Sequence, residues 1–224
     1  MASAVVHPAA EAPDAEAEEA GRRLFAQPCE FVAGAASIAA IPADGLPELA
    51  FAGRSNVGKS SLLNALTGRR ALARISRTPG RTQQLNFFAL GRRLMLVDLP
   101  GYGFAAVSKQ QAAGWTALTQ RYLNGRSSLR RVLLLIDARH GVKDADRPVM
   151  AMLDEAAVSF QLVLTKIDET EPADLAERLG AIAAELKTHV AAHPIIHLTS
   201  AERGDGIAAL RAAASALAAP APPR

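Results

Sequence analysis

Cysteine is almost absent from this chain of 224 residues, in which Cys29 is the only one. One cysteine cannot form an internal disulfide bond, which is consistent with a reducing compartment. No uninterrupted apolar run approaches the roughly 20 residues that a membrane-spanning helix requires. The N-terminus also lacks the basic stretch followed by an apolar stretch that is typical of a signal peptide. We therefore expect a soluble cytoplasmic protein that has no membrane association.

Lysine and arginine are missing from the first 20 residues, which contain five acidic residues. Because this segment is rich in Ala, Glu and Pro and has no periodic apolar pattern, we expect residues 1–22 to be a disordered acidic tail. The formal net charge of +3 therefore arises downstream, mainly from arginines within 69–81 and 121–131. Such clusters suit a phosphate backbone, but a solvated basic face explains the charge pattern equally well.

Short apolar stretches alternate with helical patterns along the rest of the chain. The apolar stretches predict strands at 31–41, 48–52, 85–90, 94–99, 132–136, 160–164 and 195–198. The helical patterns predict helices at 59–67, 108–125, 146–157, 172 to about 192, and 207–217. This alternation is typical of an α/β domain whose mainly parallel sheet is covered by helices on both faces. We expect the Ala-Pro-rich residues 219–224 to be a flexible C-terminal tail.

Residues 53–60 form the pattern G-x-x-x-x-G-K-S between a predicted strand and a predicted helix. Backbone N–H groups that converge at a helix N-terminus bind phosphate without side-chain charge. Gly53 and Gly58 let the backbone approach closely, Lys59 would reach the β- and γ-phosphates, and the Ser60 hydroxyl would bind Mg²⁺. A chance glycine-rich turn is the alternative, but strand and helix flank the loop in the order that a phosphate site requires.

Residues 98–101, with the sequence Asp-Leu-Pro-Gly, follow another predicted strand. Open α/β sheets place their ligands at such strand ends. The Asp98 carboxylate would hold Mg²⁺ through water, and Gly101 would offer its N–H to the γ-phosphate. The motif carries little information alone, but its distance from the phosphate loop and its place at a strand end favour this interpretation.

Residues 165–168, with the sequence Thr-Lys-Ile-Asp, indicate which base is bound. The Asp168 carboxylate can accept hydrogen bonds from guanine N1–H and N2–H₂, and adenine lacks both donors. Lys166 would lie along the base, and the amides of Ser200 and Ala201 would meet guanine O6. An ordinary surface pair is the alternative for Lys166 and Asp168.

The order of these motifs resembles that of the translation-factor-related GTPases. Three stretches resemble the EngB/YsxC family closely: G-R-S-N-V-G-K-S-S at 53–61, T-P-G-R-T-Q-Q-L-N-F-F at 78–88 and V-D-L-P-G-Y-G-F-A at 97–105. The resemblance covers about residues 24–216. It implies a three-layer P-loop GTPase (G-domain) fold with one antiparallel edge strand, in a single GTPase domain at 23–218.

The resemblance also implies an activity and partners. A member of this family slowly hydrolyses GTP to GDP and phosphate and acts as a switch in assembly of the bacterial large (50S) ribosomal subunit. Its partners would be ribosomal RNA and ribosomal proteins, and a role in cell division and septation is expected. We expect the chain to be a monomer.

The resemblance further assigns roles to single residues. Thr82 would close on Mg²⁺ and the γ-phosphate, which makes 69–84 the first switch segment and 101–110 the second. A solvent-facing loop threonine is the alternative. The catalytic candidates are Lys59, Thr82 and Gly101, and the Mg²⁺ ligands are Ser60, Thr82 and, through water, Asp98. The residues expected to contact GTP or GDP are Gly53, Arg54, Ser55, Asn56, Val57, Gly58, Lys59, Ser60, Ser61, Gly80, Arg81, Thr82, Gln83, Gln84, Asp98, Leu99, Pro100, Gly101, Thr165, Lys166, Ile167, Asp168, Thr199, Ser200 and Ala201.

Four positions need separate interpretation. Tyr102 stands where Ras-type enzymes have the glutamine that orients the attacking water, so we expect slow hydrolysis and leave the water-positioning residue unassigned. Thr165 stands where GTPases at large most often have asparagine. It can still tie the base loop, residues 165–168, to the phosphate loop, residues 53–60. Glu169 stands where family members often have lysine, which puts a charge contact there in doubt. Asn56 suggests K⁺ as an additional cofactor, and a loop residue that satisfies its own turn is the alternative.

Two other functions stay open from the sequence alone. A regulatory GTPase switch with a protein partner and no ribosomal role would not associate with 50S particles. An ATP-using P-loop enzyme would keep its nucleotide preference after Asp168→Asn, whereas a GTPase would lose its guanine selectivity.

Overall fold

A computed structural model describes residues 12–43, 45–69, 84–103 and 117–220. Its centre is a seven-stranded sheet with the order β1-β3-β4-β2-β5-β6-β7. The strands are β1 (Cys29–Ala35), β2 (Glu48–Gly53), β3 (Leu85–Leu90), β4 (Leu94–Asp98), β5 (Leu129–Asp137), β6 (Phe160–Thr165) and β7 (His197–Leu198). The helices are α1 (Ala15–Phe25), α2 (Lys59–Thr67), α4 (Arg147–Glu155), α5 (Pro172–Leu186) and α6 (Ile207–Ser215), with short 3₁₀ turns η1 (Ile38–Ala40) and η3 (Ile167–Glu169). Residues 117–123 are also helical.

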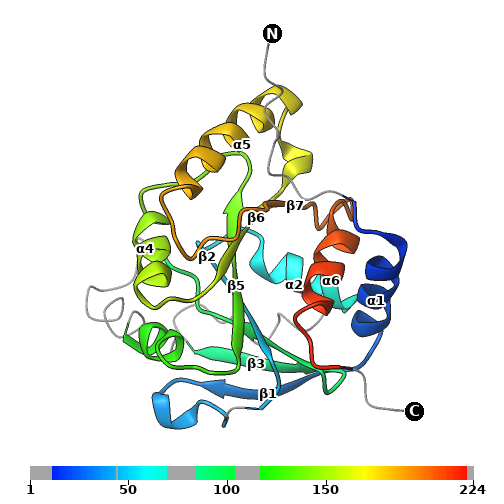
Figure 1. The fold of residues 1–224 in the computed structure, drawn as a ribbon, viewed down its shortest axis with the longest axis vertical. Coiled ribbons are helices and arrows are strands. Elements are labelled where there is room, and N and C mark those ends of the chain that lie inside the picture. Colours follow the sequence, from blue (N-terminus) through cyan, green and yellow to red (C-terminus); the bar gives the residue numbers. More distant parts are fainter. Residues whose placement is uncertain (1–11, 44, 70–83, 104–116, 221–224) are drawn as a thin grey trace.

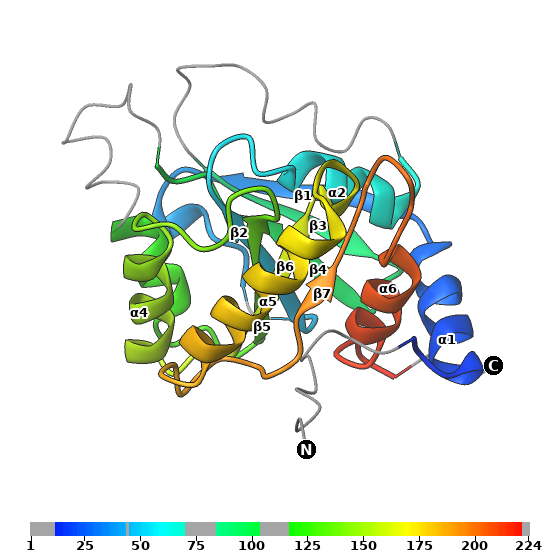
Figure 2. The same ribbon diagram turned by 90° about the horizontal axis from the view of Figure 1, so that it is seen from above.

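Helices cover both faces of the sheet, as the alternating sequence pattern predicts (Figures 1 and 2). Successive side chains of β5 point to opposite faces, so Leu134 belongs to one apolar core and Leu133 to the other. The first core also contains side chains of α4, α5 and 117–123, and the second contains side chains of α1, α2 and α6. The α/β class with a mostly parallel sheet is therefore confirmed.

The reversed strand is not at the sheet edge, which corrects one detail of the expected fold. β3 pairs antiparallel with β4 on one side and with β1 on the other. β1 therefore occupies the edge and runs in the same direction as β4. The tight turn between β3 and β4 is readable from the sequence, but the long-range pairing of β1 is not.

The prediction of a disordered tail through residue 22 is wrong from Ala15 onward, where α1 begins. The Asp14 carboxylate accepts a hydrogen bond from the Ala17 N–H at 2.7 Å and caps the helix. Leu24 and Phe25 are buried against the second core. The apolar pattern of α1 is weak because only three of its residues are buried. Most of the helix therefore has the polar composition that is expected of a disordered tail. Residues 1–11 lie outside the described residues.

The predicted C-terminal tail also differs in part from the structure. Ala219 belongs to the predicted C-terminal tail, but its N–H donates to the Arg93 carbonyl at 2.9 Å and its carbonyl accepts from Arg93 Nε at 2.8 Å. The helix expected at 108–125 is described only from residue 117.

Within the described ranges, no helix combines the length and apolarity needed to cross a bilayer.

Arg126 is used inside the fold rather than for a phosphate backbone. Its guanidinium forms an ion pair with Glu48 at 2.5 Å and donates to the Pro42 carbonyl at 2.8 Å. The Tyr122 hydroxyl donates to the same carboxylate at 2.8 Å. Glu48 is 1% exposed, so this buried carboxylate requires those donors. The cluster at 121–131 is therefore less available for nucleic acid than its sequence indicates.

Candidate nucleotide site

The loop between β2 and α2 has the geometry of a phosphate cradle. Gly58 has φ +99° immediately before α2, and the helix begins at Lys59. A Cβ at Gly53 would lie 2.8 Å from the Val57 side chain, so only glycine lets the loop fold back onto the buried Val57. The loop therefore presents its backbone at the α2 N-terminus, where N–H groups favour an anion.

Asp98 lies beside the phosphate loop because β4 and β2 are parallel neighbours, with Phe51 opposite Asp98. Its carboxylate is 4% exposed and forms an ion pair with the Lys59 ammonium. Ser60 follows Lys59 in the first turn of α2. The Ser60 hydroxyl at the start of α2 and the Asp98 carboxylate at the end of β4 are oxygen donors of the kind that Mg²⁺ prefers, so these residues fit that ion.

The segment after Asp98 runs along the phosphate loop. The Ser55 N–H donates to the Tyr102 carbonyl at 3.1 Å, and the Tyr102 N–H donates to the Gly53 carbonyl at 3.4 Å. A Cβ at Gly101 would lie 3.1 Å from Ser55 Oγ, so glycine allows this close approach. Leu99 is buried at 2% exposure and can offer a ligand only its backbone.

The base loop is tied to the phosphate loop by two hydrogen bonds. The Thr165 hydroxyl donates to the Val57 carbonyl at 2.6 Å, and the Lys166 ammonium donates to the Asn56 carbonyl at 2.9 Å. The predicted tie through Thr165 is therefore confirmed. Lys166 adopts φ +59°, a left-handed backbone conformation that is uncommon outside glycine. These contacts hold the two ligand loops at one edge of the sheet.

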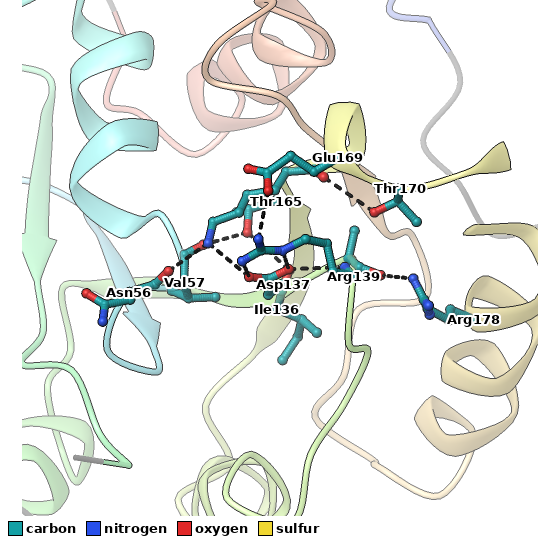
Figure 3. Close-up of polar contacts among 11 residues, drawn as sticks. Asn56, Val57, Ile136, Asp137, Arg139, Thr165, Glu169, Thr170 and Arg178 are labelled. Atoms are coloured by element: carbon teal, nitrogen blue, oxygen red, sulfur yellow. Dashed lines mark hydrogen bonds and ion pairs between the residues drawn. The ribbon is translucent and has the colours of Figure 1, made fainter. Parts of the chain in front are cut away.

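Asp137 is a site residue that the sequence reasoning missed. It ends β5 directly opposite Thr165 of β6. Its carboxylate accepts from Lys166 Nζ at 3.0 Å and from Arg139 Nε and Nη2 at 2.9 and 2.7 Å (Figure 3). Burial by itself raises the pKa of this carboxyl, but the hydrogen bonds from Arg139 and Lys166 outweigh it and hold the pKa well below its usual range. The signal available in the sequence was an acidic residue at the end of a buried strand.

Glu169 makes a charge contact, which its departure from the family pattern had put in doubt. Arg139 Nη1 lies 2.7 Å from Glu169 Oε2, so Arg139 bridges Glu169 and Asp137 (Figure 3). Glu169 is the last residue of η3, the turn that contains Asp168. The arginine therefore links the base loop to the end of β5.

A cavity of about 590 Å³ lies between α2 and the base loops. Residues from three predicted motifs line it, namely Gly58, Ser61, Thr165, Lys166, Asp168, Thr199 and Ala201. Asn64, Arg69 and Glu202 also line it and were not expected. The Asp168 carboxylate, which we expect to bind guanine, therefore lines the same cavity as the first turn of α2.

The expectation for the Ser200 amide needs correction. Its N–H donates to the Asp205 carbonyl at 3.0 Å, and its hydroxyl accepts from the Arg203 N–H at 2.9 Å. Both groups are therefore engaged within the turn after β7, which leaves the neighbouring Ala201 amide as the candidate donor to a base.

Part of the expected site lies outside the described residues, namely Gly80, Arg81, Thr82 and Gln83 with most of both switch segments. Gln84 is described, and its side-chain amide donates to Asn86 Oδ1 at 2.9 Å. Asn86 pairs with Asp98 across β3 and β4, so Gln84 lies at the same sheet edge as the phosphate loop.

A phosphate cradle, a buried acidic residue at the adjacent strand end and a base loop bound to the cradle define a P-loop GTPase. Residues 48–166 match the family model described as "50S ribosome-binding GTPase". Crystal structures share this fold at low sequence identity. One of a probable GTP-binding protein engB has a TM-score of 0.56 and 23% identity, covering 73% of this chain and 94% of the other. One of Era with MgGDPNP and nucleotides 1506–1542 of 16S ribosomal RNA has a TM-score of 0.58 and 22% identity, covering 80% and 58%.

Curated relatives define the family more narrowly. The probable GTP-binding protein EngB of Rhodospirillum rubrum is 58% identical over 211 residues, which cover 92% of this chain and 91% of the relative. The protein of the same name from Ruegeria pomeroyi is 54% identical over 209 residues, which cover 93% and 96%. The chain belongs to the EngB family of GTP-binding proteins, and it is a GTP-hydrolysing enzyme.

Proposed function

We propose that this chain is a nucleotide-dependent switch that acts in the cytoplasm during assembly of the large (50S) ribosomal subunit. The observation that carries the proposal is the match of residues 48–166 to a family described as 50S ribosome-binding GTPases. That range contains the phosphate loop, the Asp98–Gly101 segment and the first two residues of the base loop, Thr165 and Lys166. We also propose a role in cell division and septation, as in the family it resembles. This role would be indirect, because defective ribosome assembly would impair division.

The proposed chemistry uses positioned charges around GTP. Lys59 would contact the β- and γ-phosphates, and Mg²⁺ would supply further positive charge where the leaving phosphate develops its negative charge. Ser60 and Thr82 would bind that ion, with Asp98 acting through water. Gly101 would donate its N–H to the γ-phosphate, so its position reports whether GTP or GDP is bound. Hydrolysis would be slow because Tyr102 stands where Ras-type enzymes have the glutamine that orients the attacking water, and its hydroxyl donates to Asp146 instead.

Cosedimentation with 50S particles tests the ribosomal role. The protein is mixed with particles in GDP, in a non-hydrolysable GTP analogue and without nucleotide, at several salt concentrations. We expect association that depends on the GTP analogue and weakens with salt, because contacts to RNA phosphates release counterions. Asp168→Asn with the same nucleotides is the control for guanine dependence. Absence of association in every nucleotide state would favour the alternative, a regulatory GTPase with a protein partner.

A K⁺ ion beside Asn56 is a further part of the proposal. Asn56 is exposed in the phosphate loop with φ +65°, and its carbonyl is held by Lys166. A cation bound there would place positive charge between phosphates, where an arginine finger acts in other GTPases. We expect faster GTP turnover in KCl than in NaCl at matched ionic strength, and loss of the difference in Asn56→Ala. Equal turnover of the unmodified protein in both salts would contradict this.

A further inference from the structure

Asp146 is a buried carboxylate that belongs to none of the nucleotide motifs. It precedes α4 and is 0% exposed, but its side chain makes no capping hydrogen bond to that helix. Its Oδ2 accepts from the Lys143 N–H at 2.8 Å. Its Oδ1 accepts a hydrogen bond from the Tyr102 hydroxyl at 2.7 Å and lies 3.3 Å from Arg54 Nε, which is an ion-pair distance without hydrogen-bond geometry. A buried charge is costly unless it is paired, so these partners account for its presence.

The two side chains on Oδ1 come from the two segments that surround the γ-phosphate position. Arg54 is the second residue of the phosphate loop, and Tyr102 directly follows Gly101. The backbones of these segments are also paired, but one of the two bonds, from the Tyr102 N–H to the Gly53 carbonyl, is long at 3.4 Å. The backbone pairing therefore has one hydrogen bond of ordinary length, from the Ser55 N–H to the Tyr102 carbonyl at 3.1 Å, and the side-chain contact adds to it.

The hydrogen bond from the Tyr102 hydroxyl to Asp146, here called the anchor, is buried and persists at physiological pH. Tyr102 is 6% exposed, and burial together with the nearby charge of Asp146 raises the pKa of its hydroxyl, which remains a donor at physiological pH. A hydrogen bond from a neutral donor to a charged acceptor is among the stronger ones in proteins. Gly103 follows with φ +74°, and Arg54 and Ala145 lie against it.

We propose that Asp146 is a positioning residue for recognition of the γ-phosphate. By holding Tyr102 and Arg54 on one carboxylate, it sets the separation between Gly101 and the phosphate loop. This inference rests on the role proposed for the Gly101 N–H. GDP has no γ-phosphate, so the anchor contributes to binding of GTP and to its hydrolysis but not to binding of GDP.

Tyr102→Phe tests the anchor by removing one hydroxyl. Affinities for GDP and for guanosine 5′-(β,γ-imido)triphosphate are measured by titration, and GTP hydrolysis is measured in a single turnover. We expect about tenfold weaker binding of the analogue and about tenfold slower hydrolysis, with GDP affinity changed less than about twofold. Asp146→Asn should act in the same direction, and the double variant should be no worse than the stronger single variant because both act through one contact.

Tyr122→Phe is the matched control. The Tyr122 hydroxyl also donates to a buried carboxylate, Glu48 Oε2 at 2.8 Å, but Glu48 begins β2 whereas the phosphate loop follows the end of that strand. We expect this variant to lose stability without changing the ratio of the two affinities.

The inference is overturned if Tyr102→Phe leaves the affinity ratio unchanged or weakens both nucleotides in parallel. Should Asp146→Asn fail to fold, the ratio in Tyr102→Phe decides alone. The measurement uses no ribosomes, so failure of the ribosomal proposal would leave it unaffected. If the protein binds 50S particles but Tyr102→Phe leaves the ratio of GTP-analogue affinity to GDP affinity unchanged, only the role of Asp146 is refuted.

Discussion

Asp168 is the side chain that we propose determines the preference for guanine. It lines the cavity beside α2 together with Thr165 and Ala201. Its neighbour Lys166 is bonded to Asp137 and to the phosphate loop, which holds the short turn that carries Asp168. A carboxylate fixed in this way can accept two hydrogen bonds from guanine, and adenine would leave it unpaired.

We expect Asp168→Asn to weaken GDP binding by about 100-fold, because an amide cannot accept both guanine hydrogen bonds and leaves a donor facing a donor. Competition binding with GDP, xanthosine diphosphate and ADP measures the effect, and the amide should favour the xanthine base, which has an acceptor at position 2. Glu202→Gln is the control, because this carboxylate lines the same cavity outside the motif. An unchanged guanine preference in Asp168→Asn would contradict the assignment.

Asp137 and Glu169 differ in how far solvent screens their ion pairs with Arg139. Asp137 is 4% exposed and accepts from two cationic side chains, whereas the Glu169 side chain is 49% exposed in its pair with Arg139. Solvent screens the second pair, and such surface pairs contribute only about 0–1 kcal/mol. The contact of Glu169 therefore contributes little, whereas Asp137 is the buried carboxylate that pairs with both Lys166 and Arg139.

At the scale of elements, α1 is part of the folded domain because it packs along α6. A Cβ at Gly21 would lie 2.6 Å from the Ala212 backbone nitrogen, so glycine allows the two helices to touch. The Arg211 side chain lies over the Phe25 ring, and its guanidinium donates to the Leu66 carbonyl at the end of α2. The N-terminal helix is therefore connected through α6 to the helix that carries the phosphate loop.

Two glycine-to-alanine substitutions separate helix propensity from packing. At Gly180 in α5 a Cβ meets nothing within 4 Å, so Gly180→Ala should raise the melting temperature by about 2–4 °C through higher helix propensity. At Gly21 the same change forces α1 away from α6, and we expect the melting temperature to fall by at least that amount. Thermal unfolding followed by circular dichroism measures both. A rise in both variants would mean that the contact of α1 with α6 is not close in solution.

At the scale of the whole molecule, stability should depend on pH through His197 in β7. This side chain is 4% exposed, and among the described residues its Nε2 has no hydrogen-bond partner. Burial first, and then the charges of His193 and Arg131, lower its pKa from an ordinary 6.5 to about 4. The unfolded chain therefore binds a proton below about pH 6.5 that the folded chain does not bind until about pH 4.

Stability should consequently fall as the pH is lowered from about 6.5 towards 4, by roughly 3 kcal/mol for this group at most. Urea unfolding at pH 7.5, 6.5, 5.5 and 4.5 measures the free energy of unfolding. His197→Gln cannot take up the proton and should show a smaller decrease over this range, whereas a variant of the exposed His140 should behave as the unmodified protein does. Equal decreases in all three proteins would contradict the prediction.

Sequence alone was enough to predict the α/β class, the phosphate loop at 53–60, the Asp98–Gly101 segment and the base loop at 165–168. Each of these motifs is local, because a strand, a tight loop and a helix N-terminus follow one another within a few residues. Their spacing also predicts that they meet, since carboxyl ends of parallel strands lie at one edge of a sheet. The tie between Thr165 and the phosphate loop was predictable for the same reason.

The contacts that hold these motifs in place became visible only in the three-dimensional structure. Asp137 reaches Lys166 across 29 positions, Tyr102 reaches Asp146 across 44, and Tyr122 reaches Glu48 across 74. No local pattern marks such pairs, because each partner alone has the appearance of an ordinary charged or aromatic residue. α1 was misassigned for the same reason: its few apolar side chains acquire their meaning only when α6 covers them. Long-range packing, rather than motif chemistry, determines which of these groups is buried and therefore which must be paired.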